Sequence, residues 1–132
     1  MKFLIVDDNE TSAGLLLNYL KDSGECHVAY SGEEALNTIQ SAMETGDPYD
    51  VICLDIMMPI IDGIETLRTI RELEQSTFNI SGRKSAIIMT SALDDIKTIM
   101  RSFKEMCDGY LTKPIKKRDL LDKIDQVKLR TE

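Results

Sequence analysis

Five short hydrophobic runs recur along the chain, and a segment with helical periodicity follows each of them. The runs are residues 3–6, 26–30, 51–55, 86–90 and 109–112. Runs of this length, bounded by turn-forming residues, predict strands. The first run, Phe3-Leu4-Ile5-Val6, is hydrophobic at every position, which is typical of a strand buried on both faces.

After each run, hydrophobic residues repeat every three or four positions, which predicts five amphipathic helices. The repeats are Ala13, Leu16, Leu17 and Leu20; Leu36, Ile39 and Met43; Ile60, Ile64, Leu67 and Ile70; Ile96, Ile99, Met100 and Phe103; and Leu120, Leu121, Ile124 and Val127. Asn9 is a favourable N-cap for the first helix, and Ser31 with Glu34 has the form of a capping box for the second. Residues 75–84 are mostly polar and predict a loop. The alternation of strands and helices predicts one α/β domain over residues 1–132, with a parallel sheet and helices on both faces.

Reactive side chains stand at the ends of four predicted strands. Asp7 and Asp8 follow the first strand, Asp55 ends the third, Thr90 ends the fourth, and Lys113 follows the fifth. An open parallel sheet binds its ligands outside the carboxyl ends of its strands. We therefore expect these five side chains to meet at one edge of the sheet.

Three neighbouring carboxylates repel one another, and a hard divalent cation relieves that repulsion. Magnesium prefers a few carboxylates, retained waters and a phosphoryl oxygen. Asp8 and Asp55 are therefore the expected ligands, with Asp7 acting through water. The metal would offset phosphoryl charge and leave Asp55 able to act as a nucleophile. Lys113 supplies a cation and Thr90 a hydroxyl for the same oxygens, an arrangement that suits phosphoryl transfer.

These motifs resemble the receiver domain of two-component response regulators, over essentially the whole chain. The resemblance rests on Asp7-Asp8, Leu54-Asp55-Ile56-Met57-Met58-Pro59, Asp62-Gly63, Thr90-Ser91-Ala92 and Lys113-Pro114. It implies a flavodoxin-like (βα)5 fold with strand order 2-1-3-4-5. It also implies a phosphorylation-dependent signalling switch, in which Asp55 accepts a phosphoryl group from a phosphohistidine of a sensor kinase or phosphotransfer protein.

The resemblance also implies a role for each site residue. Magnesium would be bound by Asp8, Asp55 and the backbone carbonyl of Met57, and the phosphoryl oxygens by Thr90, the Ser91 amide and Lys113, with Met57 beside them. Tyr110 occupies the position of a switch aromatic, whose ring turns inward as Thr90 moves. The alternative is a tyrosine on an edge strand with a solvated hydroxyl. A downstream protein would then bind the face made by the fourth helix, fifth strand and fifth helix.

Met57 and Ala92 stand at two positions that vary in the family and tune the lifetime of the phosphoryl group. Neither side chain can orient an attacking water by hydrogen bonding. We therefore expect slow self-dephosphorylation. The alternative is that Met57 only packs over the loop.

Composition narrows the possible partners and location. The net charge of −7 argues against binding to duplex nucleic acid. Residues 113–132 nevertheless hold seven basic residues against four acidic ones, which indicates either a solvated helix face or a partner-binding patch. The odd, widely spaced Cys26, Cys53 and Cys107 favour reduced thiols. Together with the lack of a signal peptide or membrane-length hydrophobic segment, they predict a cytoplasmic protein.

Several alternatives stay open at this stage. A phosphatase that forms an aspartyl phosphate usually has a second Asp two residues after the nucleophile, where this chain has Met57. A flavin carrier would need a Ser/Thr/Gly-rich loop where Asp7-Asp8 stands. His27, on the short second strand, is expected to be structural or at the surface. The chain could be a stand-alone regulator, monomeric or dimerising on phosphorylation, or the receiver of a hybrid kinase or DNA-binding regulator.

Overall fold

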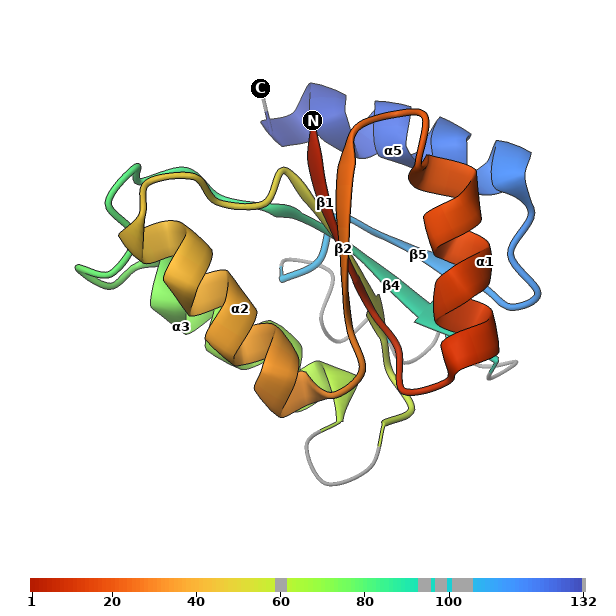
Figure 1. Cartoon of the computed structure of the whole chain (residues 1–132), viewed down its shortest axis with the longest axis horizontal. Helices are drawn as coiled ribbons and strands as arrows, with labels where there is room; N and C mark the ends of the chain where they lie inside the picture. Colours follow the sequence, from red (N-terminus) through yellow and green to blue (C-terminus); the bar gives the residue numbers. More distant parts are fainter. Residues whose placement is uncertain (59–61, 93–95, 97–99, 101–105, 132) are drawn as a thin grey trace.

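The computed structural model describes residues 1–58, 62–92, 96, 100 and 106–131 (Figure 1). Its elements are β1 (Lys2–Val6), α1 (Glu10–Leu20), β2 (Glu25–Ala29), α2 (Gly32–Glu44), β3 (Val51–Asp55), α3 (Gly63–Glu74), β4 (Ala86–Ser91), β5 (Gly109–Thr112) and α5 (Lys117–Thr131). The five strands form one parallel sheet in the order β2-β1-β3-β4-β5. The predicted fold class and strand order are therefore confirmed.

Helices cover both faces of the sheet, with α1 and α5 on one side and α2 and α3 on the other (Figure 1). Alternate residues of each strand point to opposite faces, so that Leu4 and Ile52 pack toward α2 and α3, whereas Phe3 and Cys53 pack toward α1 and α5. All five residues of β3 are buried. This explains why the sequence of β3 is hydrophobic up to Asp55.

Part of the predicted fourth helix falls within the described residues. Ile96 and Met100 are helical, and both are buried in the core beside α2 and α3. The other two members of that predicted repeat, Ile99 and Phe103, lie outside the described residues, as does Ile60 of the third repeat.

The predicted helix starts are confirmed. The Asn9 side chain accepts a hydrogen bond from the Ser12 amide at 2.9 Å, and Ser31 Oγ accepts one from the Glu34 amide at 3.1 Å. The Glu34 carboxylate accepts a bond in return from the amide of Tyr30, one residue before the cap. These bonds satisfy amides that a helix start leaves without partners, and they fix where each helix leaves the sheet.

The start of α3 packs closely against the end of β3. The Gly63 amide donates to the Ile56 carbonyl at 2.9 Å, and a Cβ atom at Gly63 would lie 2.2 Å from the Asp55 carbonyl oxygen. A side chain larger than hydrogen would therefore force the helix away from the strand. Gly63 allows α3 to begin directly beside Asp55.

Candidate functional site

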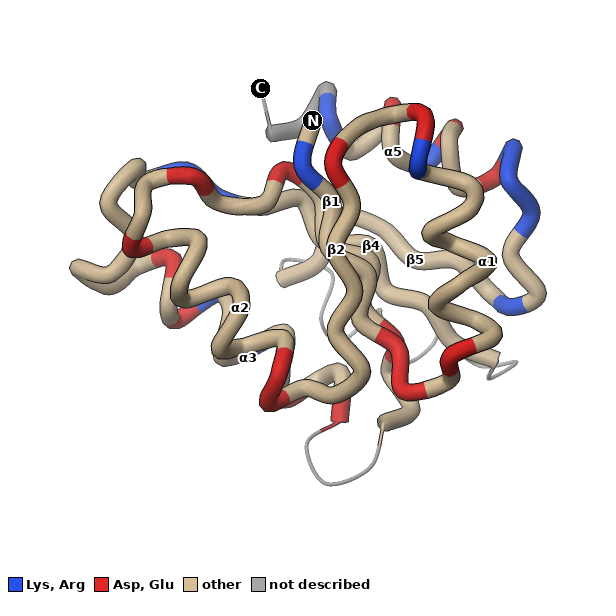
Figure 2. The backbone as a smooth tube through the Cα atoms, in the orientation of Figure 1, with Lys and Arg blue, Asp and Glu red and all other residues tan. Residues whose placement is uncertain are grey.

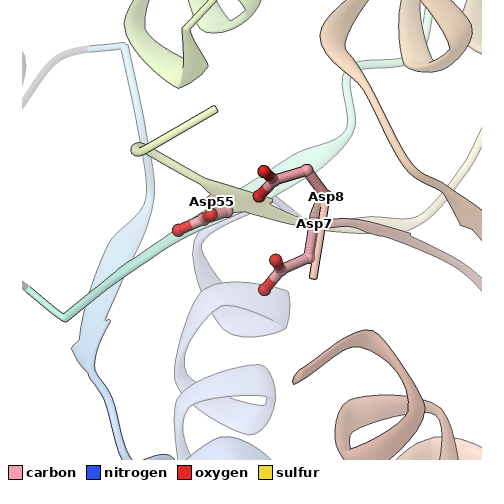
Figure 3. A group of neighbouring side chains, drawn as sticks. All are labelled: Asp7, Asp8 and Asp55. Atoms are coloured by element: carbon pink, nitrogen blue, oxygen red, sulfur yellow. The ribbon is translucent and has the colours of Figure 1, made fainter. Parts of the chain in front are cut away.

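Three carboxylates meet where β1 and β3 end. Asp7 and Asp8 directly follow β1, and Asp55 is the last residue of the neighbouring β3. Figure 3 shows the three side chains directed into one space, and one carboxylate oxygen from each lies within 4.8 Å of the others. Asp7 and Asp55 are buried, whereas Asp8 is exposed and keeps the site open to water. The predicted convergence of these residues is confirmed.

Lys113 is the cation that the structure places among these carboxylates. Its Nζ lies 2.7 Å from Asp7 Oδ2 and 3.5 Å from Asp55 Oδ1. The closer partner is therefore Asp7, which also accepts a hydrogen bond from the Asn9 amide at 2.9 Å. One lysine offsets the charge of only one of the three carboxylates, so negative charge remains in excess.

Burial and the neighbouring negative charges both act on Asp55. Burial first, and then the charges of Asp7 and Asp8, raise the pKa of its carboxyl to about 6, against the opposing effect of Lys113. Each of these factors except Lys113 disfavours the ionised form. A cation placed between the carboxylates would stabilise that form and lower the pKa.

The ligand atoms that the three aspartates offer indicate which metal ions the pocket could bind. Carboxylate oxygens are the ligands that hard divalent cations such as magnesium, calcium and manganese prefer. Three carboxylates around one space, with a single lysine beside them, suit a cation of charge two. In the part of the chain that the structure describes, this is the one group of His, Cys, Asp and Glu side chains arranged to hold a metal. The acidic pocket is therefore able to bind a metal.

Backbone hydrogen bonds bring the remaining predicted site residues to the same edge. Thr90 pairs with Asp55 in the register of β3 and β4, and its carbonyl accepts a bond from the Ile56 amide at 3.0 Å. The Lys113 amide donates to the Ser91 carbonyl at 2.7 Å. Thr90 and Ser91 are both buried. The ends of β3, β4 and β5 are thus tied together around Asp55.

Met57 lies at the rim of the site and is 58% exposed. Ile56, Met57, Met58 and Asp62 line a shallow hollow there. Asp62 also caps α3, because its carboxylate accepts a hydrogen bond from the Glu65 amide at 2.9 Å. The exposed Met57 leaves this side of the pocket accessible to solvent.

Tyr110 lies on the edge strand β5 and is partly buried. It packs against the core that β4 shares with α2 and α3, and it is level with Met89 in the strand register. Its predicted role in switching stays a prediction, since that role concerns a change between two states.

His27 lies apart from the acidic cluster. Its Nδ1 shares a hydrogen bond with the Tyr49 hydroxyl, and the two rings meet edge to face with centroids 5.5 Å apart. Glu25 lies beside its other ring nitrogen, with Nε2 and Oε2 3.6 Å apart. These contacts agree with the expected structural or surface role.

The sequence reasoning did not anticipate a second cluster of charged side chains, which are buried or partly buried. Arg71 Nη1 lies 2.7 Å from Glu74 Oε1, and Arg71 Nη2 lies 3.1 Å from Asp108 Oδ2. Glu74 continues the hydrophobic repeat of Leu67 and Ile70 and is buried, with its side chain 1% exposed. A charged residue on a hydrophobic helix stripe was the signal that could have revealed this cluster.

Comparison with known proteins identifies the class to which this fold and site belong. Residues 3–125 match the model of the response regulator receiver domain. The chain is 32% identical over 124 residues to the chemotaxis protein CheY of Halobacterium salinarum, covering 94% of this chain and 93% of that protein. The solved receiver domain of the Francisella response regulator 1452 superposes with a TM-score of 0.77 at 32% identity, covering 99% of this chain and 98% of that one.

Other relatives are much longer than this chain. It is 33% identical over 132 residues to the transcriptional regulatory protein SrrA of Staphylococcus aureus, and it spans 49% of that protein. It is 37% identical over 120 residues to hybrid signal transduction histidine kinase L of Dictyostelium discoideum, of which it spans 7%. Receiver domains thus occur in proteins of very different organisation.

The chain belongs to the response regulator receiver family. As a receiver domain it is a phosphorylation-dependent switch of two-component signalling, a system in which receiver domains interact with histidine kinases and downstream effectors. Within the described residues, no helix has the length and hydrophobicity needed to cross a membrane.

Proposed function

We propose that Asp55 is the residue that receives the phosphoryl group. A carboxylate oxygen of Asp55 attacks the phosphorus of a phosphohistidine on a kinase or phosphotransfer protein; the new O–P bond forms as the N–P bond breaks, and the imidazole leaves. The observation that carries the proposal is the position of Asp55, buried at the end of β3 with Asp7, Asp8 and Lys113 around it.

Magnesium is the proposed cofactor. Asp8, Asp55 and the backbone carbonyl of Met57 would hold it, with Asp7 contributing through water. When bound, the ion offsets negative charge on the carboxylates and on the transferring phosphoryl group. The oxygen-only donor set supports magnesium, and the excess negative charge of the pocket gives the ion a reason to bind.

Lys113, Thr90 and Ser91 are proposed to hold the phosphoryl oxygens. Lys113 Nζ is 3.5 Å from Asp55 Oδ1, so its ammonium group can reach an oxygen of a phosphoryl group attached there. The Thr90 hydroxyl and the Ser91 amide supply uncharged donors. Fixed donors of this kind stabilise the charge of the transferred group without having to reorganise during the reaction.

The response to phosphorylation is proposed to reach a protein partner through Tyr110 and α5. Tyr110 would turn inward as Thr90 moves toward the phosphoryl group, changing the surface formed by the fourth helix, β5 and α5. Figure 2 shows basic residues gathered at the start of α5, where Lys116, Lys117 and Arg118 are exposed. The proposed unit is one receiver domain over residues 1–132, cytoplasmic, and either monomeric or dimerising on phosphorylation.

Slow loss of the phosphoryl group is part of the proposal. Met57 at the rim and Ala92 after β4 offer no hydrogen bond that would orient an attacking water. Replacing Met57 with Asn introduces such a group and should shorten the half-life of the phosphoryl group. A wild-type half-life of seconds in magnesium, or no change in Met57→Asn, would contradict this part of the proposal.

The main experiment measures phosphorylation directly. The protein is incubated with magnesium and acetyl phosphate, and its intact mass is determined. We expect a gain of one phosphoryl group in the wild type and none in Asp55→Asn. Asp119→Asn, which removes an exposed carboxylate on α5, is the matched control and should gain the group normally. No gain in the wild type with any donor would refute the proposal.

A further inference from the structure

The loop between α3 and β4, residues 75–85, buries a polar side chain and exposes two hydrophobic ones. Asn79 is 7% exposed, whereas its neighbours Phe78 and Ile80 are 45% and 68% exposed. A free loop gains by the opposite arrangement, since hydrophobic surface is driven out of water and a buried amide requires partners. Specific contacts must therefore hold the loop in this inverted form.

Asn79 provides those contacts. Its side-chain amide donates to the Glu74 carbonyl and to the Arg83 carbonyl, both at 3.0 Å. The Ile80 amide donates to the Met43 carbonyl at the end of α2 at 3.3 Å. The loop is thus fixed from the inside and against a second helix. Because its backbone is held in this way, Phe78 and Ile80 are presented to solvent by a defined scaffold.

The base of the loop is anchored as well. The Ser85 hydroxyl donates to the Tyr49 carbonyl at 2.6 Å, and the Ser85 amide donates to the Glu74 carboxylate at 2.7 Å. Exposed hydrophobic side chains on such a rigid support are typical of binding surfaces, where little conformational entropy is lost when a partner binds.

Two basic residues follow the two hydrophobic ones within the same loop. Arg83 and Lys84 are exposed, and no Asp or Glu occurs from residue 75 to residue 91, although the chain as a whole has a net charge of −7. The acidic neighbour of Arg83 is Asp50, with Nη1 and Oδ1 3.9 Å apart, and the Arg83 side chain remains 57% exposed. The positive charge at this loop is therefore available to a partner.

We propose that Phe78, Ile80, Arg83 and Lys84, here called the loop surface, bind an acidic peptide segment of a partner protein through its hydrophobic side chains. Hydrophobic residues of the segment would cover Phe78 and Ile80, and its carboxylates would face Arg83 and Lys84. A second copy of this chain fits less well, because two molecules of net charge −7 repel each other.

The position of the loop surface separates it from the phosphorylation site. Figure 1 shows the loop beyond the carboxyl end of α3, whereas the amino end of that helix, at Asp62 and Gly63, lies beside Asp55. A bound segment would leave the acidic pocket open. Binding is therefore expected to be the same whether or not Asp55 is phosphorylated, so that the loop surface acts as a constant attachment point.

The test begins with a random library of displayed peptides. Peptides that bind the wild-type protein are collected, and those that also bind the double variant Phe78→Ser/Ile80→Ser are removed. The remaining peptides, called the survivors, are synthesised for affinity measurements. We expect survivors that combine Asp or Glu with hydrophobic residues. The charge reversal Arg83→Glu/Lys84→Glu should weaken their binding about tenfold or more. The matched control, Leu15→Ser with Lys21→Glu/Arg68→Glu, alters an exposed hydrophobic residue and exposed basic residues elsewhere and should leave peptide binding unchanged.

Other outcomes would overturn the proposal. These are survivors without acidic residues, equal loss of binding in the control, or no peptide that distinguishes wild type from the Phe78→Ser/Ile80→Ser variant. The proposal would also be wrong if the wild type self-associates in sedimentation experiments and Phe78→Ser/Ile80→Ser does not, since the loop surface would then bind a second copy of the chain. Thermal unfolding verifies that each variant is folded. Asp55→Asn should bind the peptides as well as the wild type does, so the result is independent of whether Asp55 is the phosphoacceptor.

Discussion

Two clusters of charged side chains lie at opposite ends of the sheet and are built from the same kinds of residue. At the carboxyl ends of the strands, Asp7, Asp8 and Asp55 share Lys113. Figure 2 shows the acidic residues where β1 leads into α1. At the amino ends of β4 and β5, Arg71 joins two carboxylates of the described residues. The Arg71 cluster has one negative charge in excess and the acidic pocket has two, and the clusters differ further in the hydrogen bonds that hold their charged groups.

The cluster at the amino ends of the strands is saturated with hydrogen bonds. Arg71 donates to the Met106 carbonyl at 2.6 Å and to the Ser85 carbonyl at 2.9 Å, in addition to its two carboxylate partners. One of those partners, Asp108, also accepts a bond from the Ile87 amide at 2.8 Å. Charged groups that are held by hydrogen bonds in this way stabilise one conformation.

The acidic pocket has the opposite character. Three carboxylates compete for one ammonium group, and the pKa of Asp55 rises to about 6 as a result of burial and its neighbours. A mismatch of this kind costs stability, and it is relieved when a cation binds. The comparison indicates that the larger excess of negative charge, rather than buried charge as such, distinguishes the proposed functional site from the Arg71 cluster.

The largest expected effect comes from breaking the saturated cluster. Arg71→Met should lower the free energy of unfolding by about 3 kcal/mol, because it leaves the buried charge of Glu74 and the partly buried charge of Asp108 without their cation. Urea denaturation measures the change. Arg118→Met, which removes an exposed arginine 4.0 Å from Asp122, serves as the control and should cost less than about 0.5 kcal/mol. Equal effects of the two substitutions would contradict the comparison.

Removing a charge from the acidic pocket should stabilise the protein, whereas removing Arg71 should destabilise it. Without metal at pH 7, Asp55→Asn should raise the free energy of unfolding by about 1–2 kcal/mol, since it removes a buried negative charge and its repulsion by Asp7 and Asp8 in a pocket that stays partly open to water. Urea denaturation in the presence of a chelator measures the gain, and a loss of stability would contradict it.

The same variant has a defined pH dependence. The pKa of Asp55 is about 6 in the folded protein, above its ordinary value of 3.8, so the folded state keeps this proton at a pH where the unfolded state has lost it. The wild type therefore loses stability from this group as the pH rises from about 4 to 6. The advantage of Asp55→Asn should be complete above pH 6 and absent near pH 4. An advantage that does not change with pH would show that the ionised Asp55 carboxylate is not its cause.

Adding magnesium should stabilise the fold by an amount similar to that of Asp55→Asn. At a concentration ten times the dissociation constant, the ion should raise the free energy of unfolding by about 1.4 kcal/mol, because it binds only the folded pocket. Asp8→Asn should reduce this increment, whereas Arg71→Met should keep it, since Arg71 lies at the other end of the sheet. The effect is measured by following the unfolding midpoint as magnesium is added. If both variants lose the increment equally, the acidic pocket and the Arg71 cluster do not have separate roles.

The sequence was most informative where a single local pattern determined the structure. The predicted bounds of β3 and β5 match the structure, and the polar residues at the strand ends meet because parallel strands point the same way. Features that depend on packing between distant segments were not predictable. Examples are the bonds from Arg71 to Met106 and Asp108, and the preference of Lys113 for Asp7 over Asp55.

The loop between α3 and β4 shows the same limit. Its polar composition predicted a loop, and residues 75–85 do connect the two elements. Composition did not show that Asn79 would be buried between exposed Phe78 and Ile80, because that arrangement depends on carbonyl groups which only the folded chain brings near Asn79.

The central claim is that the unmatched carboxylate Asp55, and no other residue, receives the phosphoryl group. Borohydride reduces an aspartyl phosphate to homoserine, and peptide mass spectrometry then locates the modified position. After reaction with acetyl phosphate and magnesium, we predict homoserine at position 55 and unmodified residues at positions 7, 8 and 27. Homoserine at Asp7 or Asp8, or a phosphoryl group on His27, would contradict the account.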